Sequence, residues 1–382
     1  MSALGVGGAE TWLMELLRFW TRNHAVQADI LASSGNAGSF DEEARSLGNE
    51  VHYIPYGAKS IANFARQFRL LLRGNHYDAI HGHQDYTSGW HFLLGAGVLP
   101  PVRVAHVHNP WMHIETNYQI SLVRRMTVAA GEKLVDRYAT NVCGTSAEVL
   151  RHYGYEPGRR RRPSVSVVHC GINVKKFNAP REVDRQSVFH EFGFPVDAKI
   201  ILCVGRLDRA LQIGHPQNHK NTWFAYKVAC AALERDPRIR LLMAGGGDSL
   251  GELQGIVAES GQPDRLRIVG LRSDVPRLMR AADLLLFPST QEGLGMAAVE
   301  AQAAGLPVLA SNAVPREALV VPELYHALSL SEPINRWVET CLSVMSGSRA
   351  DLRHCRQLLE VSDFSIENSA RRLEQIYAAA RA

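Results

Sequence analysis

The sequence predicts two α/β domains, each a doubly wound parallel sheet covered by helices. With 382 residues the chain is too long for one ordinary domain and long enough for two domains with separate cores. Short apolar segments alternate with helical patterns of ten or more residues, which is typical of βαβ units and parallel strands. The alternation restarts after residue 198, so we expect the second domain there.

The first domain begins with a helical pattern. Residues 8–24 place apolar side chains such as Trp12 and Leu16 on one helix face. Strands and helices then alternate as far as residue 173. The expected strands are 27–33, 49–56, 77–83, 102–109, 138–146 and 164–173, and the expected helices are 60–75, 88–98, 119–138 and 147–154.

The second domain repeats the pattern with strands that are almost continuously apolar, as expected for strands buried on both faces. We predict domains at 1–175 and 190–365, a hinge near 172–195, and a C-terminal helix, 366–382, that could cross back to the first domain. The expected strands are 199–207, 239–247, 266–270, 283–289 and 306–311, and the expected helices are 221–236, 250–261, 274–282 and 296–305.

The composition is typical of a soluble globular protein. Apolar residues make up 46% and charged residues 21%, and no run of apolar residues is long enough to span a bilayer. The N-terminus lacks the pattern of a secretory signal, and the six cysteines form no CxxC pair. We therefore expect a cytoplasmic protein with reduced thiols.

Positive charge is concentrated in the first half. Residues 1–180 hold 19 Lys and Arg against 14 Asp and Glu, whereas the whole chain has a formal charge of +4. Four consecutive arginines, 159–162, could meet anionic lipid or phosphate, or could form a solvated loop. No aromatic residues stand beside them for stacking, so nucleic-acid binding is not expected.

A glycine-rich loop opens the first helix. Gly7 and Gly8 would let a ligand approach the backbone, and the helix N-terminus favours an anion. The alternative is a tight turn alone, and the pattern is not the GxGxxG dinucleotide fingerprint. Only four residues precede the loop at Gly5, so we expect the first strand of this domain to be missing.

Histidines lie at the ends of two expected strands. His81 and His83 alternate on one strand and His106 and His108 on the next, so each pair could share a face. No carboxylate or cysteine spacing completes a metal site, and we expect none. A role facing a ligand is favoured over that of satisfied polar residues at the sheet end.

Two cations flank a further strand end. Arg206 directly follows a buried strand and Lys220 directly precedes a helix, so both could bind one diphosphate. The alternative is that both are ordinary surface charges. In open parallel sheets, ligands bind beyond the carboxyl ends of the strands.

The stretch from Gln291 to Val308 contains two glutamates. Glu292 is expected in a loop and Glu300 in the first turns of a helix that begins near Met296. The backbone N–H groups of Gly293, Leu294, Gly295 and Met296 would suit a phosphate oxygen. Glu300 could accept hydrogen bonds from a vicinal diol such as a ribose, or the glutamates could only cap the helix and face solvent.

The sequence resembles the retaining two-domain GT-B glycosyltransferases of family 4 (group 1), particularly the bacterial exopolysaccharide and capsule-type members. The segment EGLGMAAVEAQAAGLPVLAS is similar to the paired-glutamate motif of that family. Other similar segments are GVGGAE, VRVAHVHN and VVHCGINVKKF, so the resemblance extends over most of the chain. Departures are the missing first strand, about eight additional residues before Lys220, and Asn173 in place of an aspartate.

The resemblance implies roles for these residues on two Rossmann-like domains that face a central cleft. Glu300 would bind the nucleotide ribose, and Glu292 would lie beside the donor sugar. Arg206 and Lys220 would hold the diphosphate. The resemblance further assigns backbone amides at Gly293, Leu294, Gly295 and Met296, a donor-sugar histidine at His108 (or His106, one pleat away), and cleft-lining glycines at Gly7 and Gly8.

The resemblance also implies a reaction. A sugar would move from a UDP- or GDP-sugar to a glycan or polyprenyl-diphosphate-linked acceptor, with retention of configuration and no metal or other cofactor. The protein could contact the anionic inner face of the cell membrane. Two alternatives remain open, a truncated, non-catalytic nucleotide-binding partner and a sugar-nucleotide epimerase.

Overall fold

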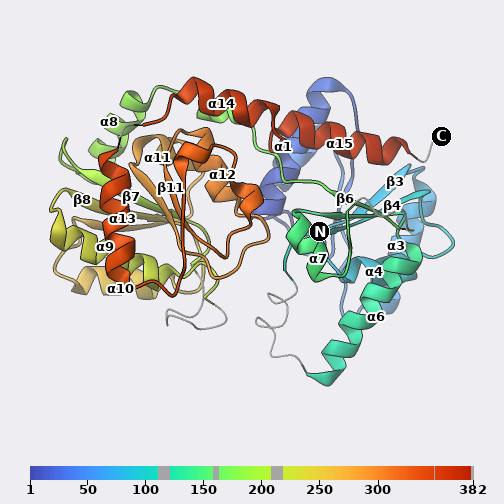
Figure 1. Ribbon diagram of the computed structural model, residues 1–382. Coiled ribbons are helices and arrows are strands. Elements are labelled where there is room, and N and C mark those ends of the chain that lie inside the picture. The colour runs from blue at the N-terminus through green and yellow to red at the C-terminus, as the bar shows by residue number, and fades with distance from the viewer. Residues whose placement is uncertain (111–120, 158–162, 208–217, 348, 380–382) are drawn as a thin grey trace. The chain divides into compact units, whose positions relative to one another are not determined.

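The chain forms two compact units (Figure 1). Unit 1 comprises Met1–Asn173 and Asp363–Ala382, and unit 2 comprises Val174–Ser362. Each unit has its own parallel sheets, so the predicted α/β class with two doubly wound domains is confirmed. The computed structural model describes residues 1–110, 121–157, 163–207, 218–347 and 349–379.

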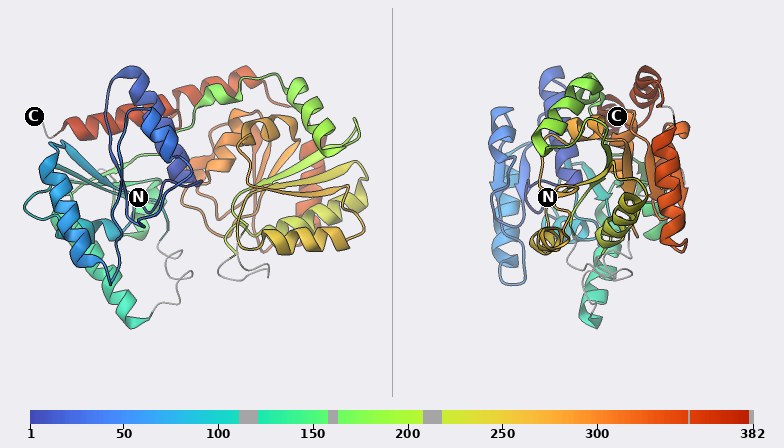
Figure 2. Two further views of the ribbon diagram at one scale, coloured as in Figure 1. Left: turned by 180° about the vertical axis from the view of Figure 1, so that it is seen from behind. Right: turned by 90° about the vertical axis from the view of Figure 1, so that its left-hand side faces the viewer.

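Unit 2 is a six-stranded parallel sheet in the order β12-β11-β10-β7-β8-β9. Helices lie on both of its faces (Figure 2), which explains why β8, β10 and β11 are buried along their whole lengths. The strands are β7 (Lys199–Val204), β8 (Ile239–Ala244), β9 (Leu266–Gly270), β10 (Leu284–Phe287), β11 (Val308–Ser311) and β12 (Tyr325–Leu328). The α-helices are α8 (Arg181–Phe192), α9 (Thr222–Arg235), α10 (Leu250–Glu259), α11 (Val275–Ala281), α12 (Met296–Ala303), α13 (Ile334–Ser346) and α14 (Leu352–Val361), and the short 3-10 helices are Val174–Phe177, Arg316–Ala318 and Pro322–Leu324.

The expected hinge near 172–195 is largely helical. It contains α8, which packs on α11 inside unit 2. A buried ion pair joins Asp184 of α8 to Arg280 of α11. Arg185 donates a further hydrogen bond to Asp283 at 3.0 Å. These pairs between distant residues hold the segment to the domain, and sequence periodicity does not reveal them.

Unit 1 contains two parallel sheets, β1-β2 and β3-β4-β5-β6. Within the described residues no strand joins the two sheets, and Met1 donates its amino group to the carbonyl of Leu31 in β1 at 2.9 Å. The strands are β1 (Ile30–Ala32), β2 (Val51–Tyr53), β3 (Ala79–Gly82), β4 (Val102–Val107), β5 (Asn141–Gly144) and β6 (Ser164–Val167). The helices are α1 (Gly8–Asn23), α2 (Asp41–Ser46), α3 (Ile61–Gly74), α4 (Thr87–Leu94), α6 (Leu122–Tyr138), α7 (Ala147–His152) and α15 (Ile366–Ala378).

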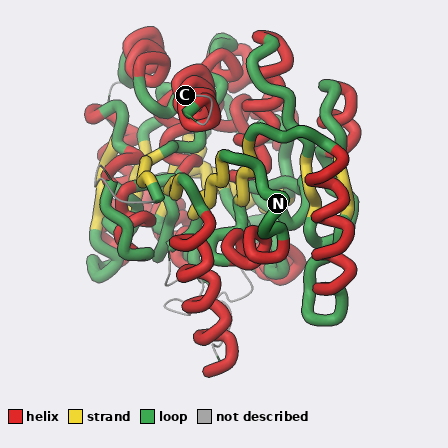
Figure 3. The backbone as a smooth tube through the Cα atoms, turned by 90° about the vertical axis from the view of Figure 1, so that its right-hand side faces the viewer, coloured by secondary structure: helices red, strands yellow, loops and turns green. Residues whose placement is uncertain are grey.

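The C-terminal helix α15 belongs to unit 1 and lies beside α1 (Figure 1). The indole N–H of Trp12 donates to the hydroxyl of Ser369 at 3.0 Å, and that of Trp20 donates to the carboxylate of Glu374 at 2.9 Å. Figure 3 shows helices on both sides of the strands of this unit. Residues from the two ends of the chain therefore build one layer of unit 1.

No helix in the described ranges has both the length and the apolar character that a bilayer span requires.

His91 is a buried histidine in the core of unit 1. Its ring lies on α4, 4.6 Å from the ring of Tyr56 and 5.1 Å from that of Phe64. Burial lowers the pKa of His91 from 6.5 to about 3. Because the folded state favours the neutral ring, its contribution to stability is present above pH 6.5 and is lost as the pH falls from 6.5 toward 3.

We expect His91→Leu to reduce the acid sensitivity of unit 1. Between pH 7 and pH 5 the free energy of unfolding should fall by about 2 kcal/mol less in the variant than in the wild type. Urea unfolding at the two pH values measures this difference. His152→Leu, which changes an exposed histidine, is the matched control, and equal pH dependence of His91→Leu and wild type would contradict the account.

Candidate functional site

Strands β7 and β10 lie at the centre of the unit 2 sheet, and their carboxyl ends lie at the same edge of the sheet. These strands are parallel neighbours, with Leu284 opposite Ile201, and the strand order reverses between them. Loops that follow the two strands diverge at such a point and leave room for a ligand. Arg206 follows β7, and the loop bearing Glu292 follows β10.

Lys220 and Glu292 are brought together at this edge. Lys220 donates from Nζ to Oε1 of Glu292 at 2.5 Å, and the same Nζ lies 5.2 Å from the ring centre of Phe287. The two loops are also joined through the backbone, because the amide of Thr290 donates to the carbonyl of His219 at 2.7 Å. The predicted phosphate-binding cation and one of the two predicted glutamates therefore share one site.

Helix α12 begins at the predicted position, and its start depends on glycine. Gly295 precedes Met296 with φ 91°, a left-handed conformation that favours glycine. A Cβ at Gly295 would also lie 2.8 Å from Cγ1 of Val314. The backbone therefore turns closely enough to direct the helix N-terminus, with its partial positive charge, to the edge of the sheet.

Glu300 lies one turn into α12. It is four residues after Met296, so the two side chains occupy the same helix face. Leu294 is buried at 4% exposure, so only its backbone suits the predicted phosphate contact. Gly293 and Glu300 are half-buried.

Arg206 is exposed. The glycine before it, Gly205, has φ 151°, and a Cβ there would lie 3.3 Å from Cδ of Lys220. A Cβ at Gly245, which follows β8, would overlap the carbonyl of Gly205. Two glycines thus let the chain pass tightly beneath the two predicted cations. The additional residues between Arg206 and Lys220 lie almost wholly outside the described part of the chain.

In unit 1 the four predicted histidines form a two-by-two array. Along the strands, the rings of His81 and His83 stack at 4.1 Å and those of His106 and His108 at 4.3 Å. Across the strands, Nε2 of His81 lies 3.2 Å from Nδ1 of His106, and Nδ1 of His83 lies 3.0 Å from Nε2 of His108. The parallel pairing of β3 with β4 creates this arrangement.

Burial keeps these rings neutral. It lowers the pKa of His81 to about 3 and that of His108 to about 4, and it holds those of His83 and His106 well below 6.5. His106 is wholly buried within β4, whereas His108 follows the strand and is half-buried. The geometry therefore favours His108 over His106 as the residue that faces a ligand.

Three further residues contact the histidine array, and the sequence patterns did not identify them as site residues. Asp85 accepts the backbone N–H of His108 at 2.8 Å, and its φ of 45° is unusual for a residue other than glycine. Burial raises the pKa of Asp85 to about 6. The ring of Trp12 lies 5.3 Å from that of His106, and the hydroxyl of Tyr377 lies 2.6 Å from Nδ1 of His81. Only Asp85, two residues after His83, carries a local signal, because Asp tolerates positive φ.

The predicted glycines stand at the start of α1. Gly7 is extended, with φ −156°, and a Cβ there would meet the carboxylate of Glu10. Gly8 is the first helical residue, is exposed, and has open space where a Cβ would be. A ligand could therefore approach the backbone at Gly8. The arginines 159–162 lie outside the described residues.

Two family models match the chain, and together they span most of it. The model described as Glycosyltransferase Family 4 matches residues 6–176. The model described as Glycosyl transferases group 1 matches residues 184–354. The first match lies within unit 1 apart from its last three residues, and the second lies within unit 2.

Individual proteins give the same result. The chain is 28% identical to EpsF of Bacillus subtilis, assigned as a glycosyltransferase, over 99% of this chain and 94% of that protein. It is 28% identical to the D-inositol 3-phosphate glycosyltransferase of Mycobacterium tuberculosis over 90% of this chain and 69% of that one.

Solved structures share the fold. HepE of Anabaena in complex with UDP superposes with a TM-score of 0.71 and 18% identity, over 98% of this chain and 96% of that one. Sucrose-phosphate synthase of Thermosynechococcus elongatus gives a TM-score of 0.72 and 22% identity, over 98% and 94%.

We expect Gly295→Ala to destabilise unit 2, because alanine is strained at positive φ and its Cβ would press on Val314. The expected loss in the free energy of unfolding is about 1–3 kcal/mol. Urea unfolding measures it. Gly255→Ala in α10 is the control, since a Cβ there meets open space and should stabilise the helix by up to about 1 kcal/mol. Equal effects of the two substitutions would contradict the role assigned to Gly295.

Proposed function

Since the chain belongs to the group 1 glycosyltransferases of the GT-B fold, we propose that it transfers a sugar from a nucleoside diphosphate sugar, with retention of configuration. The donor would be a UDP- or GDP-sugar. The acceptor would be a glycan or a polyprenyl-diphosphate-linked sugar in exopolysaccharide or cell-surface glycan biosynthesis.

The observation that carries the proposal is the arrangement at the reversal point of the unit 2 sheet. Lys220 pairs with Glu292 in the loop that leads into α12, and Arg206 follows the neighbouring strand β7. A diphosphate would meet both cations and the backbone amides near Gly295. As the bond to the sugar breaks, negative charge grows on the diphosphate, and these preorganised groups would stabilise it.

The donor would extend along both sides of this point. Glu300, one turn into α12, is suited to the ribose hydroxyls, and Glu292 to the sugar side. HepE, which shares the fold, has been crystallised with UDP and with UDP-glucose, and this supports a nucleotide sugar as donor. Glu292 would release Lys220 to the diphosphate, since a phosphate carries more charge than a carboxylate.

Unit 1 would supply a neutral imidazole to the sugar. His108 has a lowered pKa and is fixed by His83 and by the Asp85 carboxylate. A neutral ring hydrogen-bonds a sugar hydroxyl without adding charge. We propose that the leaving diphosphate takes the acceptor proton and that protein cations fill the role a metal plays in other transferases.

A lipid-linked acceptor would bring unit 1 to the inner face of the cell membrane. Helix α6 extends beyond the other described elements of unit 1 (Figures 1 and 3). Its first turns expose Leu122 by 74%, Val123 by 73% and Met126 by 65%, beside the exposed Arg125. Apolar side chains next to a cation suit insertion at an anionic lipid surface.

The two alternatives predict different products. A sugar-nucleotide epimerase would convert the donor when no acceptor is present. A non-catalytic partner would bind UDP or GDP and consume no donor with any acceptor. Incubating a panel of nucleotide sugars with and without lipid-linked acceptors, and analysing the products, separates the three functions.

We expect Glu300→Ala and Glu292→Ala to have different effects. Loss of the Glu300 carboxylate should weaken nucleoside diphosphate binding about 10- to 100-fold, because hydrogen bonds to a charged group are lost. Loss of Glu292 should lower turnover by at least tenfold, because a contact with the donor sugar is lost. Nucleotide affinity should stay within about threefold of the wild type, because Lys220 no longer has a carboxylate that competes with the diphosphate. Calorimetry with UDP and GDP and a product assay measure the two quantities.

The exposed Glu252 on α10 offers a matched control for these variants. Glu252→Ala should change neither affinity nor turnover. Unchanged values for Glu300→Ala and Glu292→Ala together would reject the site.

We expect the membrane contact to depend on both apolar and basic residues. Replacing Leu122, Val123 and Met126 by serine, or Arg159 to Arg162 by serine, should each lower binding to vesicles that contain phosphatidylglycerol by at least tenfold. Only the arginine effect should disappear in high salt. Sedimentation with anionic and neutral vesicles measures binding, and equal binding by wild type and both variants would exclude this surface.

A further inference from the structure

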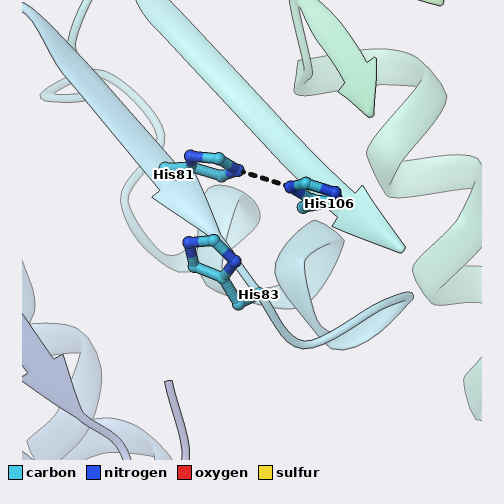
Figure 4. Close-up of side chains that lie close together, drawn as sticks. All are labelled: His81, His83 and His106. Carbon is cyan, nitrogen blue, oxygen red and sulfur yellow. Dashed lines mark hydrogen bonds between the residues drawn. The ribbon is translucent and has the colours of Figure 1, made fainter. Parts of the chain in front are cut away.

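The ends of β3 and β4 bring three imidazoles within reach of one ion (Figure 4). His81 and His83 come from one strand end and His106 from the next, and one ring nitrogen of each lies within 4.8 Å of the others. We propose that these three histidines bind a borderline transition-metal ion of the Zn²⁺, Co²⁺ or Cu²⁺ class. The inference is independent of sugar transfer, because it concerns binding alone.

The distances are close to those that such an ion requires. Zinc binds imidazole nitrogen at about 2.0–2.1 Å, so two nitrogens in a tetrahedral site lie about 3.4 Å apart. Nε2 of His81 and Nδ1 of His106 are 3.2 Å apart. The three ring nitrogens lie within 4.8 Å of one another, so the nitrogen of His83 would have to move about 1.5 Å at most toward the other two. Rotation of the side chains would then complete a site of three nitrogens.

For His81 and His83, the second ring nitrogen already has a partner of the kind that orients metal-binding histidines. Nδ1 of His81 lies 2.6 Å from the hydroxyl of Tyr377, and Nδ1 of His83 lies 3.0 Å from Nε2 of His108. If His81 and His83 bind through Nε2, both of these contacts are kept. Hydrogen bonds to the second ring nitrogen fix the tautomer and the ring direction of metal ligands.

The chemistry of the donors selects the class of ion. All three ligands are neutral imidazoles, kept so by burial. Zn²⁺, Cu²⁺ and Co²⁺ favour imidazole, whereas Mg²⁺, Ca²⁺ and Mn²⁺ favour carboxylate oxygens, which this group lacks. Another group of possible ligands in the described residues, Asp29, Glu50 and His52, is rich in oxygen and includes the exposed Glu50.

The test is a titration of the full-length protein, first treated with a chelator, with Co²⁺ alone. We expect one equivalent to bind and to give the visible absorption of tetrahedral cobalt without an intense sulfur charge-transfer band, and Zn²⁺ to displace it. His81→Gln and His106→Gln should each weaken binding at least 100-fold, and Tyr377→Phe about tenfold. His52→Gln, the matched control, should bind as the wild type does.

A second measurement uses only the wild-type protein and counts the ligands directly. The copper EPR spectrum of the wild-type chain with one equivalent of Cu²⁺ should show coupling to three imidazole nitrogens. The proposal is overturned if the wild type binds no Co²⁺, if the His52→Gln variant loses binding, or if the copper spectrum shows fewer than three nitrogens. Circular dichroism of each variant establishes that lost binding does not reflect unfolding.

Discussion

The parallel pairing of neighbouring strands is the constraint on which both candidate sites depend. In a parallel pair all carboxyl ends lie at one edge, so residues that follow successive strands meet there. In unit 2 this brings the loop after β10 to Lys220, 72 residues earlier in the chain. In unit 1 the same geometry places His81 and His83 beside His106 and His108. Functional side chains that are far apart in the sequence lie close together because the strands run parallel.

Much of this could be predicted from the sequence because it is written in local patterns. Apolar strands and helical spacing predicted the fold class, and the end of a buried strand at Pro288 with the helical pattern after it predicted the start of α12 near Met296. The segment expected as a hinge contains α8, which is held to unit 2 by the pairs of Asp184 with Arg280 and of Arg181 with Asp283, and these partners lie about a hundred positions apart in the sequence. Strand β12 and helices α13 and α14 were not predicted, although β12 pairs with β11 and α13 places Trp337 in the buried core of unit 2.

The residues of the candidate sites could be predicted from their types and their places at strand ends. The contacts between them could not. The sequence identified Lys220 and Glu292 separately, but nothing in it indicated that they form an ion pair. It identified both histidine pairs. We expected no metal site because we treated each strand separately and looked for a carboxylate or cysteine to complete it. The third imidazole comes from the neighbouring strand, and Tyr377 comes from the far end of the chain, beyond the reach of any local pattern.

The crossing between units has a consequence for biosynthesis. The chain leaves unit 1 after Asn173 and returns at Asp363, where Ile172 exchanges backbone hydrogen bonds with Phe364 and Ile366 at 2.7 and 2.9 Å. Unit 2 is therefore continuous along the chain, whereas unit 1 is not. During translation, unit 2 has all of its residues before unit 1 receives α15. The helix that supplies Ser369 to Trp12 and Tyr377 to His81 is thus made after all of unit 2, and the histidine array gains its contact with Tyr377 only then.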